Sequence, residues 1–522
     1  MGNIKNLVML LVILTPLVSY SQDKTGSGIL ERQWVATGPT GKLEYKTTPK
    51  GDRIVDFSHA GYMGGGVAIP IVKVRKEVAP SGGGDDSPAI QAAVNEVSLL
   101  PLESGFRGAV SLKPGTFQCS KPIIISQEGV VLLGSGSGKD GTLIRMTGEP
   151  HTAFIIEGPD LSYPKVTSTN SYPITDEYVP AGAQTLSVKN SKNLAVGDSI
   201  RIRWQRTAKW ISFMGMDKLV RKRKGQPDIP QTWMKEDSEM VIHRTIRSIE
   251  GNRITLDVPL TEAIDSRLLD KGVALVIKSS PLKRLGQCGI QSLQIASPPH
   301  KGDLKSGKNI SISLKGDTED CWVKDIVMRE TLNNVQVSAG GRRITITDVH
   351  SYHDSTVEKG AGYPADISIR GSQVLVDRST SHGLGGFYVA TLNSSANLNV
   401  VLNCTFEGKG SIQPHMHWST GLLIDSCNIP DGRIDLINRQ SSGSGHGWAI
   451  GWGIAWNCTV KHLQIQMPPG GLNLAIGCTG EQHKTFSKES FFSIGKPVTP
   501  ASLYLAQLRE RLGDAAVKGI GY

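Results

Sequence analysis

The sequence has few cysteines for its length, and none of them forms a closely spaced pair. Seven cysteines are spread over 522 residues. A zinc module usually shows Cys-x-x-Cys pairs, and a disulfide framework usually shows an even number of cysteines in a short chain. The absence of both patterns argues against a zinc-binding module and against a small scaffold held together by disulfides.

Long apolar runs are also scarce, and the one at the N-terminus has the form of a targeting signal. Lys5 precedes an apolar run over residues 7–18, and Ser19 and Ser21 place small residues before a cleavage point. The run is shorter than the ~20 residues that a membrane-spanning helix needs. We therefore predict a secretory signal peptide over residues 1–21, a secreted or periplasmic protein, and no transmembrane segment.

The sequence has no aspartate-rich loop of the kind that binds calcium. Such loops bring several carboxylates together within about a dozen residues. We therefore predict no calcium site and no cofactor. His415 and His417 would face the same side of a strand, so a zinc or transition-metal site at this pair is an alternative to a catalytic role.

Acidic residues are fewer than basic ones, and the formal net charge is +10. A positive surface steers anionic partners toward the protein but does not determine its fold. Nucleic acid is one such partner, whereas an exported protein more often meets anionic glycans. We predict an anionic polysaccharide as the partner, no nucleic acid, and a monomer.

A short phrase recurs in the last third of the chain. An apolar–polar–Cys–polar–apolar pattern is centred on Cys404, Cys427 and Cys458, at spacings of 23 and 31 residues. A strand phrase that returns at this period is typical of a solenoid, in which each repeat is one coil stacked on the last. We predict that these cysteines form a ladder of small buried residues. A disulfide between neighbouring coils is the alternative.

An amphipathic helix and several short strands precede this repeat. Apolar residues recur at helical spacing from Ile90 to Val97, with Asp86 as the predicted N-cap. Asp85 and Asp86 could form a catalytic pair, but we interpret them as capping residues. Residues 108–136 are β-branched strands separated by Gly and Pro turns.

Three motifs in this region resemble those of the pectate-lyase-like superfamily of right-handed parallel β-helices. Residues 85–93 match an Asp-Asp-x-x-Ala-Ile-Gln-x-Ala helix, residues 108–117 match Gly-x-Val-x-Leu-x-Pro-Gly-x-Phe, and residues 130–136 match Val-x-Leu-x-Gly-x-Gly. The resemblance implies a right-handed parallel β-helix over residues 81–490. It implies no single reaction, because the superfamily holds lyases, hydrolases and phage tail depolymerases.

The predicted fold class is therefore all-β: a solenoid with an inserted small antiparallel β subdomain and capping helices. We predict that residues 22–80 form an N-terminal segment packed on the main domain. Alternating strands predict the inserted subdomain over residues 180–262. Residues 491–522 are predicted to form a C-terminal helical cap, in which Thr499-Pro500 begins a helix.

Between the strands of the insertion, residues 204–235 combine basic side chains with tryptophans. Cations pair with carboxylate or sulfate groups, and an aromatic ring stacks on a sugar face. We predict that Arg206, Lys209 and Trp210 bind an anionic sugar chain. A solvated surface loop is the alternative reading of this stretch.

Histidine, arginine and tyrosine crowd the turns of the late coils. Because coils stack about 4.8 Å apart, residues far apart in sequence meet on one face. The predicted catalytic residues are His382, Tyr388, His415, His417, Arg439 and His446, and further substrate-binding residues are His353, Trp418 and Trp448.

These residues include the groups that β-elimination of a uronate needs. A base must remove the C5 proton, a cation must neutralise the neighbouring carboxylate, and an acid must protonate the leaving oxygen. We assign His415 or His417 as the base, Arg439 as the cation, and His446 or Tyr388 as the acid. The sequence thus predicts a polysaccharide lyase acting on a uronate-containing glycan.

A glycoside hydrolase on the same fold is the first alternative. Residues 445–447 resemble the Gly-His-Gly of polygalacturonase-type hydrolases, but the accompanying Asn-Thr-Asp, Asp-Asp and Arg-Ile-Lys motifs are missing from the required order. A hydrolase needs two facing carboxylates. The available carboxylates are Asp354, Glu358, Asp366, Asp425 and Asp435. A non-catalytic glycan-binding solenoid is the second alternative.

Overall fold

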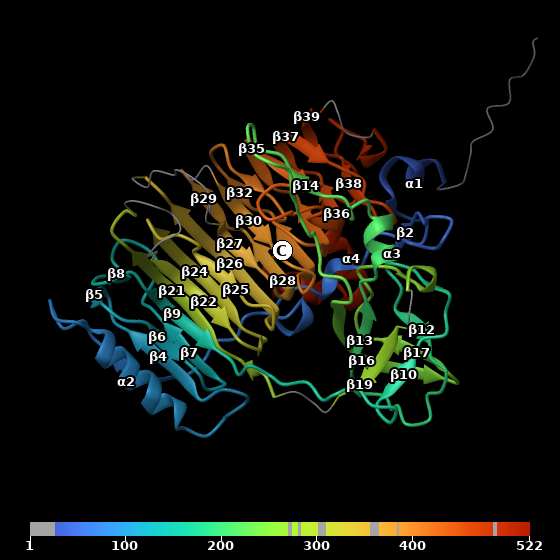
Figure 1. Cartoon of the computed structure of the whole chain (residues 1–522). Coiled ribbons are helices and arrows are strands. Elements are labelled where there is room, and N and C mark those ends of the chain that lie inside the picture. The colour runs from blue at the N-terminus through green and yellow to red at the C-terminus, as the bar shows by residue number, and fades with distance from the viewer. Residues whose placement is uncertain are drawn as a thin grey trace, which may run out of the picture.

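The structure of the chain is a computed structural model, and Figure 1 shows a long stack of strands with a smaller sheet attached to it. The structure describes residues 27–269, 274–279, 283–300, 309–354, 365–383, 386–483 and 488–522. The predicted signal peptide, residues 1–21, lies outside the described residues. No helix in these described ranges is long and apolar enough to cross a membrane.

The stack consists of parallel strands that pair from one coil to the next. The register is continuous, as where Lys324 lies beside Thr347 and Thr347 lies beside Asp377. The strands of the first face include β3 (Val74–Val78), β4 (Gly108–Leu112), β7 (Val130–Leu133), β28 (Ser372–Asp377), β31 (Asn397–Leu402), β34 (Ser419–Asp425), β36 (Ile450–Trp456), β38 (Asn473–Ile476) and β40 (Phe491–Phe492).

Three long strands begin on this face and continue on the second: β21 (Gly289–Ala296), β24 (Trp322–Arg329) and β26 (Arg342–Tyr352). The second face also contains β5 (Gly115–Cys119), β8 (Thr142–Met146), β29 (Thr380–His382), β32 (Thr405–Phe406) and β39 (Thr479–Gln482). The short strands β20 (Leu285–Gly286) and β23 (Thr318–Glu319) precede coils of this region.

The third face completes each coil. It contains β6 (Ile123–Ile125), β9 (Thr152–Glu157), β22 (Ile310–Lys315), β25 (Val335–Val337), β27 (Ala365–Ile369), β30 (Phe387–Thr391) and β33 (Ser411–Ile412). The strands β35 (Asn428–Leu436) and β37 (Thr459–Ile465) run from the second face to the third. Three parallel faces that enclose one core confirm the predicted parallel β-helix.

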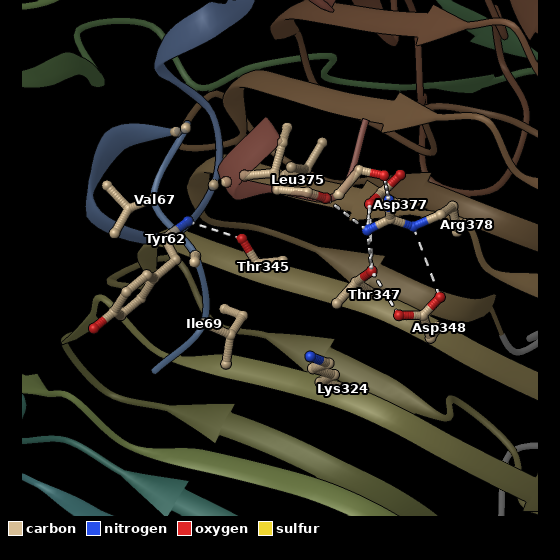
Figure 2. Close-up of a pocket in the computed structure, with 17 residues that line it drawn as sticks. Tyr62, Val67, Ile69, Lys324, Thr345, Thr347, Asp348, Leu375, Asp377 and Arg378 are labelled. Atoms are coloured by element: carbon tan, nitrogen blue, oxygen red, sulfur yellow. Dashed lines mark hydrogen bonds and ion pairs between the residues drawn. The ribbon is translucent and has the colours of Figure 1, made fainter. Parts of the chain in front are cut away.

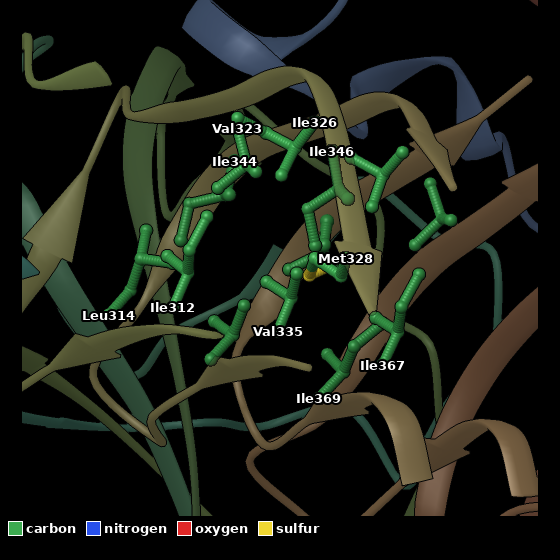
Figure 3. Packing of buried hydrophobic residues seen from close by; sticks show 14 of the residues in the cluster. Ile312, Leu314, Val323, Ile326, Met328, Val335, Ile344, Ile346, Ile367 and Ile369 are labelled. Atoms are coloured by element: carbon green, nitrogen blue, oxygen red, sulfur yellow. The ribbon is translucent and has the colours of Figure 1, made fainter. Parts of the chain in front are cut away.

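Aliphatic side chains from successive coils fill the interior. Figure 3 shows Ile312, Val335 and Ile367 packed against one another, and these three residues are register neighbours on the third face. On the first face, Val323 lies beside Ile346 in the same way. Burying an aliphatic side chain of this size contributes about 1.5–3 kcal/mol. The columns of Ile and Val are therefore the main source of cohesion between coils.

A single residue with positive φ turns the chain at the corner after the first face. In the three recurring phrases these corner residues are Asn403, Ser426 and Asn457, at φ of +48°, +56° and +49°. Asparagine adopts this left-handed conformation more readily than most residues. Each phrase thus combines a strand end, a left-handed polar corner and a buried cysteine.

The cysteines behind these corners form the predicted ladder. All seven cysteines are buried and free, so none is in a disulfide bond. The backbone N–H of Cys458 lies 3.4 Å from the sulfur of Cys478, which belongs to the next coil. Burial raises the pKa of the Cys427 thiol well above its ordinary value. The ladder is confirmed, and the alternative of disulfides between coils is wrong.

The predicted amphipathic helix is α2 (Ser87–Ser98), which buries its apolar face against the first coils. Asp86 occupies the predicted N-cap position, but its side chain accepts no capping hydrogen bond from the helix. Instead, the Asp85 carboxylate accepts the backbone N–H of Ser87 at 3.1 Å. The Asp86 carboxylate accepts backbone N–H groups from Ser81 and Gln118, both at 2.8 Å. Both aspartates therefore have structural roles, and they are not a catalytic pair.

The chain ends in α4 (Leu503–Leu512) and α5 (Asp514–Gly519), which lie along the outside of the first face. The N-cap of α4 is Ser502, whose hydroxyl accepts the Leu505 N–H at 3.2 Å, so the prediction that Thr499-Pro500 begins the helix is wrong. Asp425 of β34 accepts hydrogen bonds from the Ser502 hydroxyl at 2.7 Å and the Tyr504 N–H at 2.8 Å. These bonds hold α4 on the flank of the solenoid.

The beginning of the described chain lies against the same helix. It consists of α1 (Ser27–Gln33), β1 (Val35–Thr37), β2 (Leu43–Tyr45), η1 (Phe57–His59) and η2 (Tyr62–Gly64). Phe57 donates its backbone N–H to the Gln507 side chain at 2.9 Å, and Arg511 donates to the Ser58 carbonyl at 2.7 Å. The Tyr504 hydroxyl donates to the Ala60 carbonyl at 2.8 Å.

The inserted antiparallel subdomain is present as a six-stranded sheet. Its strands, in spatial order, are β10 (Ser171–Pro173), β19 (Leu275–Lys278), β13 (Ser199–Gln205), β16 (Glu239–Glu250), β17 (Arg253–Leu256) and β12 (Thr185–Ser187). Smaller elements accompany it: β11 (Tyr178–Val179), α3 (Ala208–Phe213), β14 (Val220–Arg221), β15 (Ile229–Pro230), β18 (Ile264–Asp265) and η3 (Ser266–Leu268). Its core includes Trp418 and Trp448 of the solenoid, so the sheet is packed on the late coils.

Thiol labelling tests the cysteine ladder. We expect seven thiols to react after unfolding in denaturant without reductant, and none in the folded protein, because all seven are free and buried. Reductant should leave the melting temperature unchanged, since no disulfide closes a loop in the unfolded chain. Fewer than seven reactive thiols in the unfolded, unreduced protein would reveal a disulfide that contradicts the ladder.

Candidate active site

Three histidines and an arginine come together where two consecutive coils leave the third face. His415 and His417 follow β33, and Arg439 and His446 lie in the loop after β35. The two loops are neighbours because β33 and β35 pair in parallel. Stacking of coils therefore brings together the four residues to which the sequence assigned the main catalytic roles.

The loop after β35 folds back on itself as a hairpin. Asn438 pairs with Trp448 in an antiparallel bridge, and the Arg439 N–H donates to the Gly447 carbonyl at 2.8 Å. Gly447 has a φ of +53°, and a Cβ atom at this position would lie 2.3 Å from the Trp233 ring. A glycine is therefore needed here, both for the backbone conformation and for the close approach to Trp233.

The insertion holds the tip of this hairpin through its separate strand pair β14–β15. Arg221 and Gln231 donate side-chain N–H groups to the Gly443 carbonyl at 2.9 and 3.0 Å. The Trp233 indole N–H donates to the backbone at the base of the hairpin at 3.2 Å. The position of His446 is thus determined jointly by the solenoid and by the insertion.

The histidine rings contact one another directly. The ring centroids of His415 and His446 are 4.8 Å apart, and those of His417 and His446 are 6.2 Å apart. Phe387 of β30 meets the His415 ring edge to face at a centroid distance of 5.5 Å. His446 is therefore a ring neighbour of both other histidines, and Phe387 is a ring neighbour of His415.

Two ring nitrogens in this cluster have no hydrogen bond. Within the described residues, His446 Nδ1 and His417 Nε2 are buried and find no partner. Buried polar atoms without partners are rare in folded proteins, and each one needs an explanation. A substrate with donor or acceptor groups would supply the missing partners.

The backbone at His417 is strained. His417 and Trp418 have φ of +46° and +61°, the only two successive non-glycine residues with positive φ in the described ranges of the chain. Left-handed backbone costs a non-glycine residue roughly 1–3 kcal/mol, and such strain often marks functional sites. The strained turn aims His417 at the hairpin that carries His446.

Burial and positive neighbours keep the three imidazoles neutral. Burial, followed by the Arg439 charge, lowers the pKa of His415 to about 3. The same two causes lower the pKa of His446 to about 4. Burial also lowers the pKa of His417, partly offset by a hydrogen bond to the Gly445 backbone. At neutral pH all three rings can accept a proton.

Arg439 is the cation of the cluster. Its Nη1 donates to the His415 carbonyl at 2.7 Å, and its guanidinium carbon lies 5.9 Å from the Phe387 ring centroid. Burial lowers its pKa, with Asp435 opposing this effect. Its other N–H groups make no hydrogen bond or ion pair with any described residue, so part of the planar donor fork is available to a carboxylate.

Two tryptophans that we predicted to bind substrate are instead part of the packing. Trp418 is 2% exposed and donates its indole N–H to Glu262 at 2.8 Å. Trp448 is 8% exposed and donates to the Met214 carbonyl at 3.1 Å. The insertion covers both rings, so neither offers a face on which a sugar could stack. This prediction is corrected to a structural role.

The three predicted binding residues of the insertion have different environments. Arg206 is 8% exposed, and it donates to the hydroxyl of Ser238 at 3.0 Å and to that of Ser394 in the solenoid. Trp210 is partly buried and stacks on Trp233 at a centroid distance of 5.2 Å. Among the three, Lys209 alone is exposed. Arg206 and Trp210 join the insertion to the coils, while the prediction for Lys209 stands untested.

Tyr388 cannot act as the acid. Its side chain is fully buried inside the solenoid and stacks on Phe406 at a centroid distance of 4.9 Å. Its hydroxyl accepts the Gly410 N–H at 2.9 Å, and burial raises its pKa to about 12. Tyr388 points inward from β30 and cannot reach a substrate, so the prediction of a catalytic role for it is wrong.

His382 and His353 also lie apart from the cluster. The His382 ring stacks on Tyr352 at a centroid distance of 4.9 Å and is hydrogen-bonded to the Glu407 carboxylate at 2.8 Å, on the second face. The His353 ring is buried and bonded to Asp366 at 2.8 Å. His382 therefore belongs to a surface ladder and His353 to a buried polar network.

Three of the five carboxylates considered for a hydrolase are already engaged. Asp425 holds α4, and Asp366 accepts hydrogen bonds from Asn334 and His353. Asp435 accepts the Gln413 side-chain N–H at 2.5 Å. These three aspartates are at most 2% exposed. Asp354 is exposed, and Glu358 lies outside the described residues.

No group of three or more histidine, cysteine or acidic side chains in the described part of the chain is arranged to hold a metal ion. His415 and His417 have His446 as a neighbour, at ring-centroid distances of 4.8 Å from His415 and 6.2 Å from His417. The metal-binding alternative for His415 and His417 stays a prediction.

Sequence reasoning missed Phe387 and Glu262. Phe387 contacts both His415 and Arg439, yet an aromatic residue at the start of a strand carries no distinguishing signal. Glu262 is buried behind Trp418, and burial raises its pKa to about 7. Its place depends on how the insertion docks, which no local pattern reveals.

No protein-family model matches the chain, and no curated protein matches it. Solved structures match it only distantly. The tailspike protein gp49 from Pseudomonas phage LKA1 is 16% identical, with a TM-score of 0.37, over 76% of this chain and 57% of the tailspike. The chain thus spans little more than half the length of that protein.

Two enzymes are among the other matches. The endo-xylogalacturonan hydrolase from Aspergillus tubingensis is 11% identical, with a TM-score of 0.33, over 81% of this chain and 99% of the hydrolase. The A-module of the mannuronan C-5 epimerase AlgE6 from Azotobacter vinelandii is 11% identical, with a TM-score of 0.30, over 85% of this chain and 100% of the module. At this level of similarity, the matches carry no conclusion about the reaction.

The stability of the protein should depend on pH through His415. Because the pKa of His415 is lowered in the folded protein, the unfolded chain binds a proton that the folded protein does not as pH falls below about 6.5. The contribution of the neutral His415 ring to the stability of the folded protein is therefore fully present above about pH 6.5, and it is lost as pH falls toward 3. When the pH falls from about 7 to 5, the free energy of unfolding of wild type should drop because of His415. In His415→Gln this drop should be smaller by up to about 1–2 kcal/mol.

Urea unfolding at the two pH values measures this difference. His462→Gln is the matched control, because His462 is a half-exposed histidine of β37 that contacts Glu481 rather than the cluster. This control should follow the wild-type pH dependence. Equal losses for wild type and His415→Gln would show that His415 titrates normally in the folded protein.

Proposed function

We propose that the chain is a polysaccharide lyase that cleaves a uronate-containing, anionic polysaccharide by β-elimination. The observation that carries this proposal is the convergence of three neutral imidazoles and one guanidinium at a single corner of the β-helix. The ring centroids of His415 and His417 lie 4.8 and 6.2 Å from that of His446, and Arg439 bonds to the His415 backbone.

His415 is the base in this proposal, with His417 as the second candidate. The His415 ring is neutral at neutral pH, so it can take the C5 proton of the uronate without first losing one. Its low pKa makes it a weak base in the free protein. A bound uronate adds a negative charge beside the ring, which raises the pKa toward the range in which general bases work best.

Arg439 neutralises the uronate carboxylate. Its N–H groups that the His415 carbonyl does not occupy can form paired hydrogen bonds with the two carboxylate oxygens. Negative charge builds up on the carboxylate as the C5 proton leaves. A fixed guanidinium in a site sheltered from water stabilises that charge more than water would.

His446 donates the proton to the leaving oxygen. With Tyr388 buried, His446 is the remaining candidate for this role, and its Nδ1 has no partner within the described residues. The pKa of His446 in the free protein is about 4, so the ring must gain a proton when the anionic substrate binds. The negative charge of the uronate favours that protonation.

The proposal includes the cellular setting of the reaction. A signal peptide over residues 1–21 would export the chain, and its positive charge of +10 would attract an anionic glycan. We propose a secreted or periplasmic monomer. Lys209, exposed on α3, is the proposed contact to the glycan outside the catalytic cluster.

Single substitutions test the catalytic assignment. We expect His415→Gln, His446→Gln and Arg439→Met each to lower kcat/KM by about 100-fold or more, because each removes a group that acts in the transition state. The assay follows the ultraviolet absorbance of the unsaturated uronate product and the release of new reducing ends on a panel of uronate and sulfated polysaccharides.

The half-exposed His462→Gln is the control, and it should retain wild-type turnover. Near wild-type turnover in His415→Gln, His417→Gln, Arg439→Met and His446→Gln together would refute the assignment. New reducing ends without ultraviolet absorbance would identify a hydrolase. Retention on a glycan column without any cleavage would identify a binding solenoid.

A further inference from the structure

A cavity lined by none of the histidine-cluster residues lies on the outside of the first face. Its volume is about 340 Å³. It is formed where three segments meet: the loop 61–69, the outward side of β24, β26 and β28, and residues 519–521 near the end of the chain. Figure 2 shows the loop on one side and the polar side chains of the strands on the other. The catalytic proposal uses none of these residues.

The strands present an ordered row of polar side chains to this cavity. Lys324, Thr347 and Asp377 are direct register neighbours on three successive coils. Neighbouring strands lie about 4.8 Å apart, so the row places a cation, a hydroxyl and a carboxylate at regular intervals. The left-handed corner residues Asp348 and Arg378 follow directly and add a second row.

Asp377 and Arg378, one from each row, form an ion pair with each other. Arg378 Nη2 lies 2.6 Å from Asp377 Oδ2, and the same nitrogen donates to the Ile520 carbonyl at 3.0 Å. The Tyr522 hydroxyl donates to the other Asp377 oxygen at 2.5 Å. Asp377 is 2% exposed. Arg378 and Asp377 therefore form the fixed wall of the cavity.

Lys324 and Asp348 are not engaged in this way. Lys324 makes no hydrogen bond or ion pair with any described residue, and Figure 2 shows its ammonium group facing the space between Ile69 and Asp348. The Asp348 side chain is 40% exposed. It accepts the Thr347 hydroxyl at 3.3 Å, and its contact with Arg378 is 3.7 Å long. The cavity thus contains one unpaired cation and one carboxylate with free acceptor positions.

The remaining walls are apolar. Val67, Ile69 and Leu375 line the cavity beside the polar rows. The loop reaches this position because of its glycines: Gly65 has a φ of +86°, and a Cβ atom there would lie 2.3 Å from the Ser58 carbonyl oxygen. The run of glycines is therefore needed to bring Ile69 over the strands.

We propose that this cavity binds a single monoanionic sugar residue, such as a uronate or a sugar sulfate. The volume lies near the lower end of the ~300–1,000 Å³ range of small-molecule sites. The anionic group pairs with the Lys324 ammonium, sugar hydroxyls donate to Asp348, and the C–H surface of the ring packs on Ile69 and Leu375. A lone ammonium next to a carboxylate favours a monoanion over a dianion, because Asp348 repels the second charge.

Calorimetric titration of the whole protein with monosaccharides tests this site. The probes are glucuronate, glucose 6-sulfate and neutral glucose. We expect at least one of the anionic sugars to bind about tenfold or more tightly than glucose, and Lys324→Gln to remove that difference, because a hydrogen bond to a charged group is lost. Added salt should weaken the binding of the anionic sugar and leave the binding of glucose unchanged.

Lys315→Gln is the matched control, since Lys315 is an exposed lysine at the end of β22. It should bind the anionic sugars as wild type does, and both variants should keep the wild-type melting temperature. The stronger of the two anionic probes identifies the charged group that the site takes. The proposal fails if wild type binds neither anionic sugar, if glucose binds equally well, or if Lys324→Gln binds as wild type does.

Discussion

The parallel pairing between successive coils is the constraint on which the rest of this structure depends. Within the strands, the backbone N–H and C=O groups of one coil pair with those of the neighbouring coils, and buried backbone groups must be paired. Every coil must therefore turn at nearly the same point. The left-handed corners at Asn403, Ser426 and Asn457 supply that turn, and the cysteine ladder fills the space behind them. The loops between faces differ in length from coil to coil, and the candidate site lies in two of these loops.

The candidate active site and the cavity beside Lys324 arise from the same rule. In each place, residues from consecutive coils lie side by side because the coils are stacked, and a segment from outside the solenoid completes the site. The insertion holds the hairpin of His446 through Gly443, and the loop 61–69 closes the cavity of Lys324. The solenoid thus determines which side chains are neighbours, while the added segments determine how deeply those side chains are buried.

The fold could be predicted because its signals are local: the spacing of Ile90 to Val97 on one helix face and the recurring cysteine phrase both act within a few residues. The grouping of His415 with His446 could also be predicted, since stacking turns a repeat period into contact. Burial could not. Trp418 is covered by a sheet from much earlier in the chain, and Tyr388 faces inward because of the phase of one short strand. Those outcomes depend on long-range docking and strand phase, which composition and spacing leave open.

The contact between α4 and the first described segment has a consequence for how the protein folds. A solenoid whose coils touch only their neighbours can grow, or fray, one coil at a time. Here Gln507 and Arg511 bond to Phe57 and Ser58, so nearly the whole length of the chain lies between the partners. Such distant contacts slow folding and cannot form until α4 has left the ribosome. Once formed, these contacts tie α4 to the first described segment on the flank of the solenoid. Unfolding that starts at the C-terminal end must first detach α4 from that flank.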